Sequence, residues 1–184
     1  LSSKPLFFIL IDNFRLDQWI LIKPLLEQFF VINEDSAYYS ILPTSTQYAR
    51  NSLFSGLMPS DIKDKFSDYW VEDFESGGKN LYEEKLLNEF LVRLGNPFKT
   101  SFNKILNLES GKKLVDKVKD LMHNDLNVII YNFVDILSHA KTDIKFIKEL
   151  AGDEKSYRDL TLTWFKNSPL FDLLKILSLI EVDV

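Results

Sequence analysis

The chain of 184 residues has no cysteine, only two histidines, and no more than six glycines and six prolines. Without cysteine, disulfides and thiolate metal sites are excluded, so any metal ligands must be histidine, carboxylate or hydroxyl groups. The scarcity of glycine and proline, together with 46% apolar and 14% aromatic residues, argues against a disordered chain. The length suits one domain with a sizeable core, and we therefore predict a single domain over residues 1–184.

Acidic residues outnumber basic residues by 27 to 22, which gives a net charge of −5. The chain therefore lacks the basic excess that drives non-specific binding to nucleic acids or membrane surfaces. The apolar run near the N-terminus, LFFILI at residues 6–11, is too short to span a membrane, and no signal-peptide cleavage site follows it. We expect a soluble, cytoplasmic protein with no membrane partner.

Short apolar segments alternate with amphipathic ones, which is typical of a layered αβα domain with a mostly parallel sheet. The continuous apolar runs at residues 6–11 and 128–134 are typical of strands buried on both faces. Weaker strand candidates lie at residues 37–42 and 101–106. The last five residues, 180–184, resemble the start of a further strand, so we expect the domain to continue beyond residue 184.

The helices are predicted from the spacing of large apolar residues. One begins within LPTSTQYARNSLFSG, residues 42–56, and ends near Gly56. A run over residues 16–30 contains Pro24, where we expect a bend or a break. Further helices are predicted over residues 81–94 and 111–126, and two or three more over residues 141–179.

Polar side chains follow three of the predicted strands. Asp12 follows the first strand, the hydroxyls of residues 44–46 follow the second, and Asp135 with His139 follows the last. Ligand sites in such sheets collect at the carboxyl ends of strands, so these groups can converge. Carboxylate oxygen and imidazole nitrogen bind divalent cations, and Asp135 and His139 lie one helical turn apart if a turn follows the strand.

Each of these features also has a simpler explanation. Asp12 and Asp135 can cap the helices that follow them, and serine or threonine before a helix is the commonest N-cap. A single histidine such as His139 is more often a surface residue than a ligand, and we assign His123 to the solvated side of a helix. A threonine hydroxyl is a poor nucleophile unless a metal lowers its pKa.

Three segments together resemble the alkaline phosphatase superfamily and, within it, the PglZ domain. LPTSTQYARNSLFSG resembles the nucleophile segment, in which a hydroxyl three residues after a proline begins a helix. FFILIDN resembles the first metal-binding strand, and YNFVDILSHA is similar to the Asp-x-x-x-His ligand pair. The similarity is greatest to the PglZ domain of PorX-type response regulators of Bacteroidetes, and it runs from about Pro5 to the end.

The resemblance implies a phosphoric ester hydrolase with two divalent metal ions, usually zinc. Asp12 and Thr46 would hold one ion, Asp135 and His139 would hold the other, and Thr46 would be the nucleophile. It also implies a phosphodiesterase acting on nucleotides or oligonucleotides, an upstream receiver domain and a sensor kinase partner, and it allows a homodimer. Arg50 and Asn51, about one turn after Thr46, are candidate substrate-binding residues by helical geometry alone.

The family pattern continues with an adjacent Asp-His pair and a final histidine, which do not follow in this chain. Each metal site would then hold only two protein ligands, so we expect the 184-residue segment alone to bind metal poorly and to be inactive. The alternative is a non-catalytic signalling module on the same fold that binds a ligand or partner. For that module the aromatic and acidic stretch 64–76 is a candidate partner surface; otherwise it is an insertion that covers the cleft.

Overall fold

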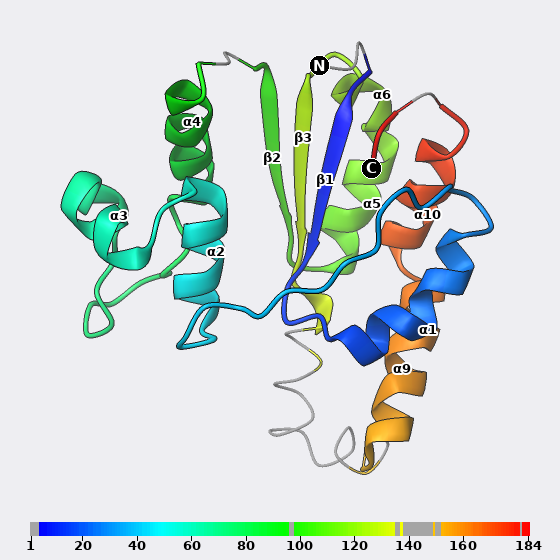
Figure 1. Ribbon diagram of the computed structural model, residues 1–184. Coiled ribbons are helices and arrows are strands. Elements are labelled where there is room, and N and C mark those ends of the chain that lie inside the picture. The colour runs from blue at the N-terminus through cyan, green and yellow to red at the C-terminus, as the bar shows by residue number, and fades with distance from the viewer. Residues whose placement is uncertain (1–3, 96–97, 135–136, 138–148, 150–151, 181) are drawn as a thin grey trace. The chain divides into compact units, whose positions relative to one another are not determined.

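The computed structural model describes residues 4–95, 98–134, 137, 149, 152–180 and 182–184 (Figure 1). The chain forms two compact units. The sheet unit comprises Leu1–Ser36 and Lys99–Val184, and the helical unit comprises Ala37–Phe98. Helices together with a parallel sheet confirm the predicted α/β class.

The sheet has three parallel strands in the order β1-β3-β2. They are β1 (Leu6–Ile11), β2 (Thr100–Ile105) and β3 (Leu126–Tyr131). The central strand, β3, is buried on both faces, as its apolar run predicts, although it begins and ends earlier than expected. On β1 the side chains of Leu6 and Phe8 are exposed, because an edge strand is covered less completely than a central one.

The register brings the three strand ends to one level. Ile11 of β1 and Ile105 of β2 both pair with Tyr131 of β3. Residues that follow β1, β2 and β3 therefore start from the same edge of the sheet, as the sequence analysis expects of parallel strands.

Five described helices belong to the sheet unit: α1 (Leu16–Leu26), α5 (Leu108–Asp116), α6 (Val118–Leu121), α9 (Glu154–Lys166) and α10 (Pro169–Leu177). Phe7, Ile129 and Phe165 meet in the same buried core as Leu170 and Leu177 of α10. Pro24 lies inside α1 and does not end it, so the helix ends three residues later, at the C-cap Glu27.

The helical unit contains α2 (Thr46–Ser55), α3 (Pro59–Lys65), the 3₁₀ helix η1 (Ser67–Tyr69) and α4 (Glu83–Arg93). As predicted, α2 ends at Gly56, whose φ of +63° is the left-handed conformation that glycine adopts without strain. The sequence pattern does not predict α3, a short helix with one buried apolar residue, Ile62.

The aromatic stretch 64–76 packs within the helical unit. The ring of Tyr69 lies 6.0 Å from that of Phe66 and 5.7 Å from that of Tyr82, and the rings of Tyr48 and Trp70 are 5.6 Å apart. These ring contacts pack the aromatic stretch against other residues of the helical unit. Its proposed role as a partner surface therefore rests on its exposed residues alone.

The predicted strand at residues 37–42 is wrong. This segment has no regular secondary structure, and the side chains of Tyr38, Tyr39 and Leu42 are largely or fully exposed. The residues favour strands by composition, but that propensity measures packing on a pleated surface and has no effect without a neighbouring strand.

The predicted strand opening at residues 180–184 forms a single parallel bridge beside β1, between Leu6 and Asp183. Phe7 N–H donates to the Asp183 carbonyl oxygen at 2.7 Å, and Asp183 N–H donates to that of Pro5 at 3.1 Å. Across the described residues, every helix is too short or too polar to cross a bilayer.

Gly111 in α5 provides a test of this packing. A Cβ at this position would lie 2.8 Å from the Tyr131 hydroxyl oxygen and 2.9 Å from Pro169 Cβ. Overpacking costs about 1–3 kcal/mol, and better helix propensity offsets about 0.5–1 kcal/mol of that. We expect Gly111→Ala to lower the free energy of unfolding by about 1–2 kcal/mol in urea denaturation.

The control is Lys112→Ala, one residue along the same helix, where the side chain is exposed. It should leave the free energy of unfolding nearly unchanged. A Gly111→Ala variant as stable as this control would show that α5 does not approach Tyr131 as closely as described.

Candidate functional site

Thr46 is the first residue of α2. Ser45 occupies the N-cap position in an extended conformation, but its side chain makes no capping hydrogen bond. Thr44 lies one residue earlier, and both Thr44 and Ser45 are exposed, whereas Thr46 is half-buried. Side-chain capping, the simpler explanation of the hydroxyl triplet, is therefore not seen at Ser45.

Arg50 lies one turn further along α2 and forms a buried ion pair with Glu83. Its Nε and Nη2 atoms donate to the two carboxylate oxygens of Glu83, each at 2.7 Å. Arg50 is 5% exposed and Glu83 0%. Glu83 begins α4, where a carboxylate is also favoured by the helix dipole. The guanidinium thus ties α2 to α4, and its predicted contact with substrate stays a prediction.

Asn51 also bonds inside the helical unit. Its Nδ2 donates to the Lys79 carbonyl oxygen at 3.2 Å, and its Oδ1 accepts from Asn80 Nδ2 at 3.3 Å. The same Asn80 Nδ2 donates to the carbonyl oxygen of Thr46 at 3.3 Å. A fourth bond runs from Gln47 Nε2 to the Val71 carbonyl oxygen, at 2.7 Å. Polar side chains therefore hold the first two turns of α2 in place.

Asp12 follows β1 directly and is 7% exposed. Its N–H donates to the Tyr131 carbonyl oxygen at 2.9 Å, which fixes its backbone to the end of β3. The N-cap of α1 is Arg15, whose N–H donates to Gln18 Oε1 at 3.0 Å. The alternative in which Asp12 caps the next helix is therefore wrong. Asp12 thus lies at the carboxyl end of a strand, where ligand sites collect in such sheets.

Asp135 and His139 lie outside the described residues, so their predicted metal-binding role stays a prediction. Within the described parts of the chain there is no group of three or more histidine or carboxylate side chains that could hold a metal ion. Asp12 belongs to the sheet unit and Thr46 to the helical unit. The surroundings of each residue are therefore those of its own unit. His123 is exposed in a turn after α6, in agreement with its assignment to solvent.

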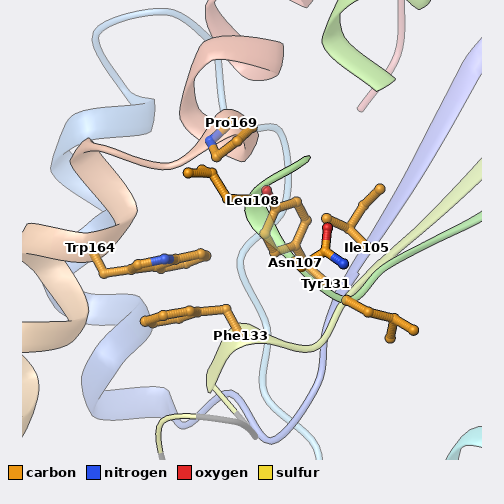
Figure 2. A pocket seen from close by; sticks show the side chains of 8 residues that line it. Ile105, Asn107, Leu108, Tyr131, Phe133, Trp164 and Pro169 are labelled. Carbon is orange, nitrogen blue, oxygen red and sulfur yellow. The ribbon is translucent and has the colours of Figure 1, made fainter. Parts of the chain in front are cut away.

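A small cavity lies at the carboxyl ends of β2 and β3 (Figure 2). The rings of Phe133 and Trp164 stack within 3° of parallel on one side of it. Burial raises the pKa of the Tyr131 hydroxyl to about 12, although the Leu170 N–H favours the ionised form. The cavity volume is about 70 Å³, whereas small-molecule sites measure roughly 300–1,000 Å³. It is too small for a nucleotide.

A larger cavity of about 660 Å³ lies within the sheet unit, beside β1. Its lining is mostly apolar and comes from α1, the segment after α1, α10 and the last residues of the chain. Neither Asp12 nor Thr46 is among the described residues that line this cavity or the smaller one. Neither cavity is the site that the sequence analysis predicts.

Asn80 and Glu83 are the residues that the sequence analysis missed. Asn80 precedes α4 and Glu83 begins it, and nothing local in the sequence relates them to Thr46 and Arg50, which lie 34 and 33 residues earlier. The carboxylate in the first turn of α4 is a sequence signal, but it indicates the start of a helix and not an ion-pair partner.

The family model described as the BREX system PglZ alkaline phosphatase-like domain matches residues 2–178. No curated protein matches the chain in sequence. The match confirms the PglZ domain that the three segments predict, and it does not distinguish the PorX type from other members.

The Arg50–Glu83 pair provides a second test. Removing one partner of a buried pair leaves a buried charge uncompensated, at a cost of about 3–5 kcal/mol. We expect Glu83→Ala to lower the free energy of unfolding of the helical unit by that amount, measured by urea denaturation. Replacing both residues with methionine should recover most of the loss, because no buried charge remains.

Glu109→Ala is the matched control, since Glu109 pairs with Lys113 at 2.6 Å on the exposed face of α5. Exposed ion pairs of this kind contribute little to stability. The urea midpoint of the Glu109→Ala variant should therefore stay close to that of the wild type. Equal effects of the two substitutions would mean that the buried pair does not hold α2 to α4.

Proposed function

Because the chain belongs to the family of PglZ alkaline phosphatase-like domains, we propose that it is a metal-dependent phosphoric ester hydrolase with Thr46 as its nucleophile. The observation that carries this proposal is the position of Thr46 at the first residue of α2. The first N–H groups of a helix have no intrahelical partner, and the dipole is positive there, so the hydroxyl stands where phosphate oxygens bind.

We assign one divalent ion, most commonly zinc in this superfamily, to Asp12 and Thr46, and a second to Asp135 and His139. Asp12 fits this role because it is a buried carboxylate at the carboxyl end of a strand and does not cap a helix. When bound, such ions lower the pKa of a coordinated hydroxyl and stabilise charge on phosphoryl oxygens.

In the proposed reaction, the Thr46 hydroxyl gives up its proton and its oxygen attacks phosphorus in line with the leaving group. A bond forms between Thr46 Oγ1 and phosphorus as the ester bond breaks, and the leaving oxygen takes up a proton. Water then attacks the phosphothreonine, releases phosphate or its monoester, and returns the proton to Thr46. The N–H groups at the start of α2 would bind a non-bridging oxygen throughout.

The finer assignments rest on the similarity of the quoted segments. We propose a phosphodiesterase that acts on nucleotides or oligonucleotides, as the effector domain of a PorX-type response regulator with an upstream receiver domain. A cytoplasmic location fits a chain without cysteine. In the alternative, the domain is a non-catalytic module that binds a ligand or partner, and Thr46 and metal are then dispensable for signalling.

Thr46 decides between these two functions. We expect Thr46→Ala in the full natural chain to lower the hydrolysis of bis(p-nitrophenyl) phosphate by at least about 1,000-fold, because no nucleophile remains. Zinc content, measured by elemental analysis, should show that metal remains bound. Thr46→Ser should keep part of the activity.

The controls are Thr44→Ala and Ser45→Ala, which remove the neighbouring hydroxyls and should leave hydrolysis close to wild type. Asp12→Asn should lower both zinc content and hydrolysis, since it removes an anionic ligand. Full activity of Thr46→Ala would exclude Thr46 as the nucleophile.

A further inference from the structure

We infer that Asn80 is a positioning residue for Thr46, an inference that rests on the proposed function of Thr46 as nucleophile. Asn80 lies in the segment before α4, 34 residues after Thr46. Its Nδ2 group donates to the Thr46 carbonyl oxygen and to Asn51 Oδ1, each at 3.3 Å. One amide group thereby links the first residue of α2 to the helix's second turn.

The link is anchored at its other end. Asn51, which is 1% exposed, donates in turn to the Lys79 carbonyl oxygen at 3.2 Å. The segment 79–80 and the start of α2 are therefore joined by three hydrogen bonds, shared between Asn51 and Asn80. Lys79 is itself bonded through Nζ to the carbonyl oxygens of Glu72 and Glu75. The anchor is thus part of a connected polar structure and not a single contact.

Asn80 acts where the ion pair does not. The Arg50–Glu83 pair holds α2 from one turn beyond Thr46, and the bonds between these two side chains do not involve the first residue itself. Helix ends fray because their terminal groups have few intrahelical partners. The bond from Asn80 falls on that first residue and restrains the backbone from which the hydroxyl projects.

The consequence is kinetic. A nucleophile must lie within a fraction of an ångström of its line of attack, and a displacement of about 1 Å can cost 100-fold in rate. Losing the restraint should slow the chemical step while leaving most substrate contacts intact. The effect therefore falls on kcat and much less on KM.

The test uses Asn80→Ala and the nearly isosteric Asn80→Asp in the full natural chain, with zinc and bis(p-nitrophenyl) phosphate. Asp keeps the size of Asn and an acceptor oxygen, but its carboxylate cannot donate to the Thr46 carbonyl. We expect both variants to lower kcat about 10- to 100-fold and to change KM by less than about threefold. If Asn80→Ala does not fold by circular dichroism, Asn80→Asp decides by the same criterion.

The matched control is Asn167→Ala in the sheet unit, which also removes a side-chain bond to a backbone carbonyl, from Asn167 Nδ2 to Thr163 at 2.7 Å. It should keep wild-type kcat. A wild-type kcat in both Asn80 variants, or a raised KM with kcat unchanged, would overturn the inference. Thr46→Ala separates the two claims: if it is inactive while the Asn80 variants are fully active, only the positioning role fails. If Thr46→Ala is fully active, the proposed function itself fails.

Discussion

The buried ion pair between Arg50 and Glu83 is the interaction on which the helical unit depends. Five residues of α2 are buried, and four of them, Gln47, Arg50, Asn51 and Ser55, are polar, so Phe54 is the one apolar contact among them. An interface of this composition gains little from the hydrophobic effect and must be held by directional bonds. The bidentate geometry of the pair offsets the desolvation of its charges and sets the angle at which α2 meets α4.

In the sheet unit the corresponding constraint is the parallel register. Because Ile11 and Ile105 both pair with Tyr131, the residues after β1, β2 and β3 leave the sheet at one edge. Asp12 continues the ladder for one more bond, to the Tyr131 carbonyl oxygen. Backbone pairing therefore fixes the position of the Asp12 main chain. A substitution of a nearby side chain would leave this pairing intact. The ends of β2 and β3 also line the small aromatic cavity (Figure 2).

The sequence predicts best where one local signal is decisive. The apolar runs of β1 and β3, and the glycine that ends α2, were each sufficient to identify an element. The segment 37–42 has the composition of a strand but lies unpaired, since pairing is a property of the neighbour and not of the segment. Helical spacing predicts that Arg50 contacts substrate. Its partner in the fold, Glu83, is 33 residues away, and spacing rules cannot find it.

The polar interface of α2 bears on the choice among three adjacent hydroxyls. Thr44 and Ser45 are exposed and precede the helix, whereas the carbonyl of Thr46 is held by Asn80 within the first turn. Apolar contacts alone let a helix slide or rotate at little cost, because they are non-directional. Hydrogen bonds do not, since their energy falls steeply with angle and distance. A fold that restrains the backbone of one residue through such bonds favours that residue for a reaction in which position determines rate, and this supports the proposal for Thr46.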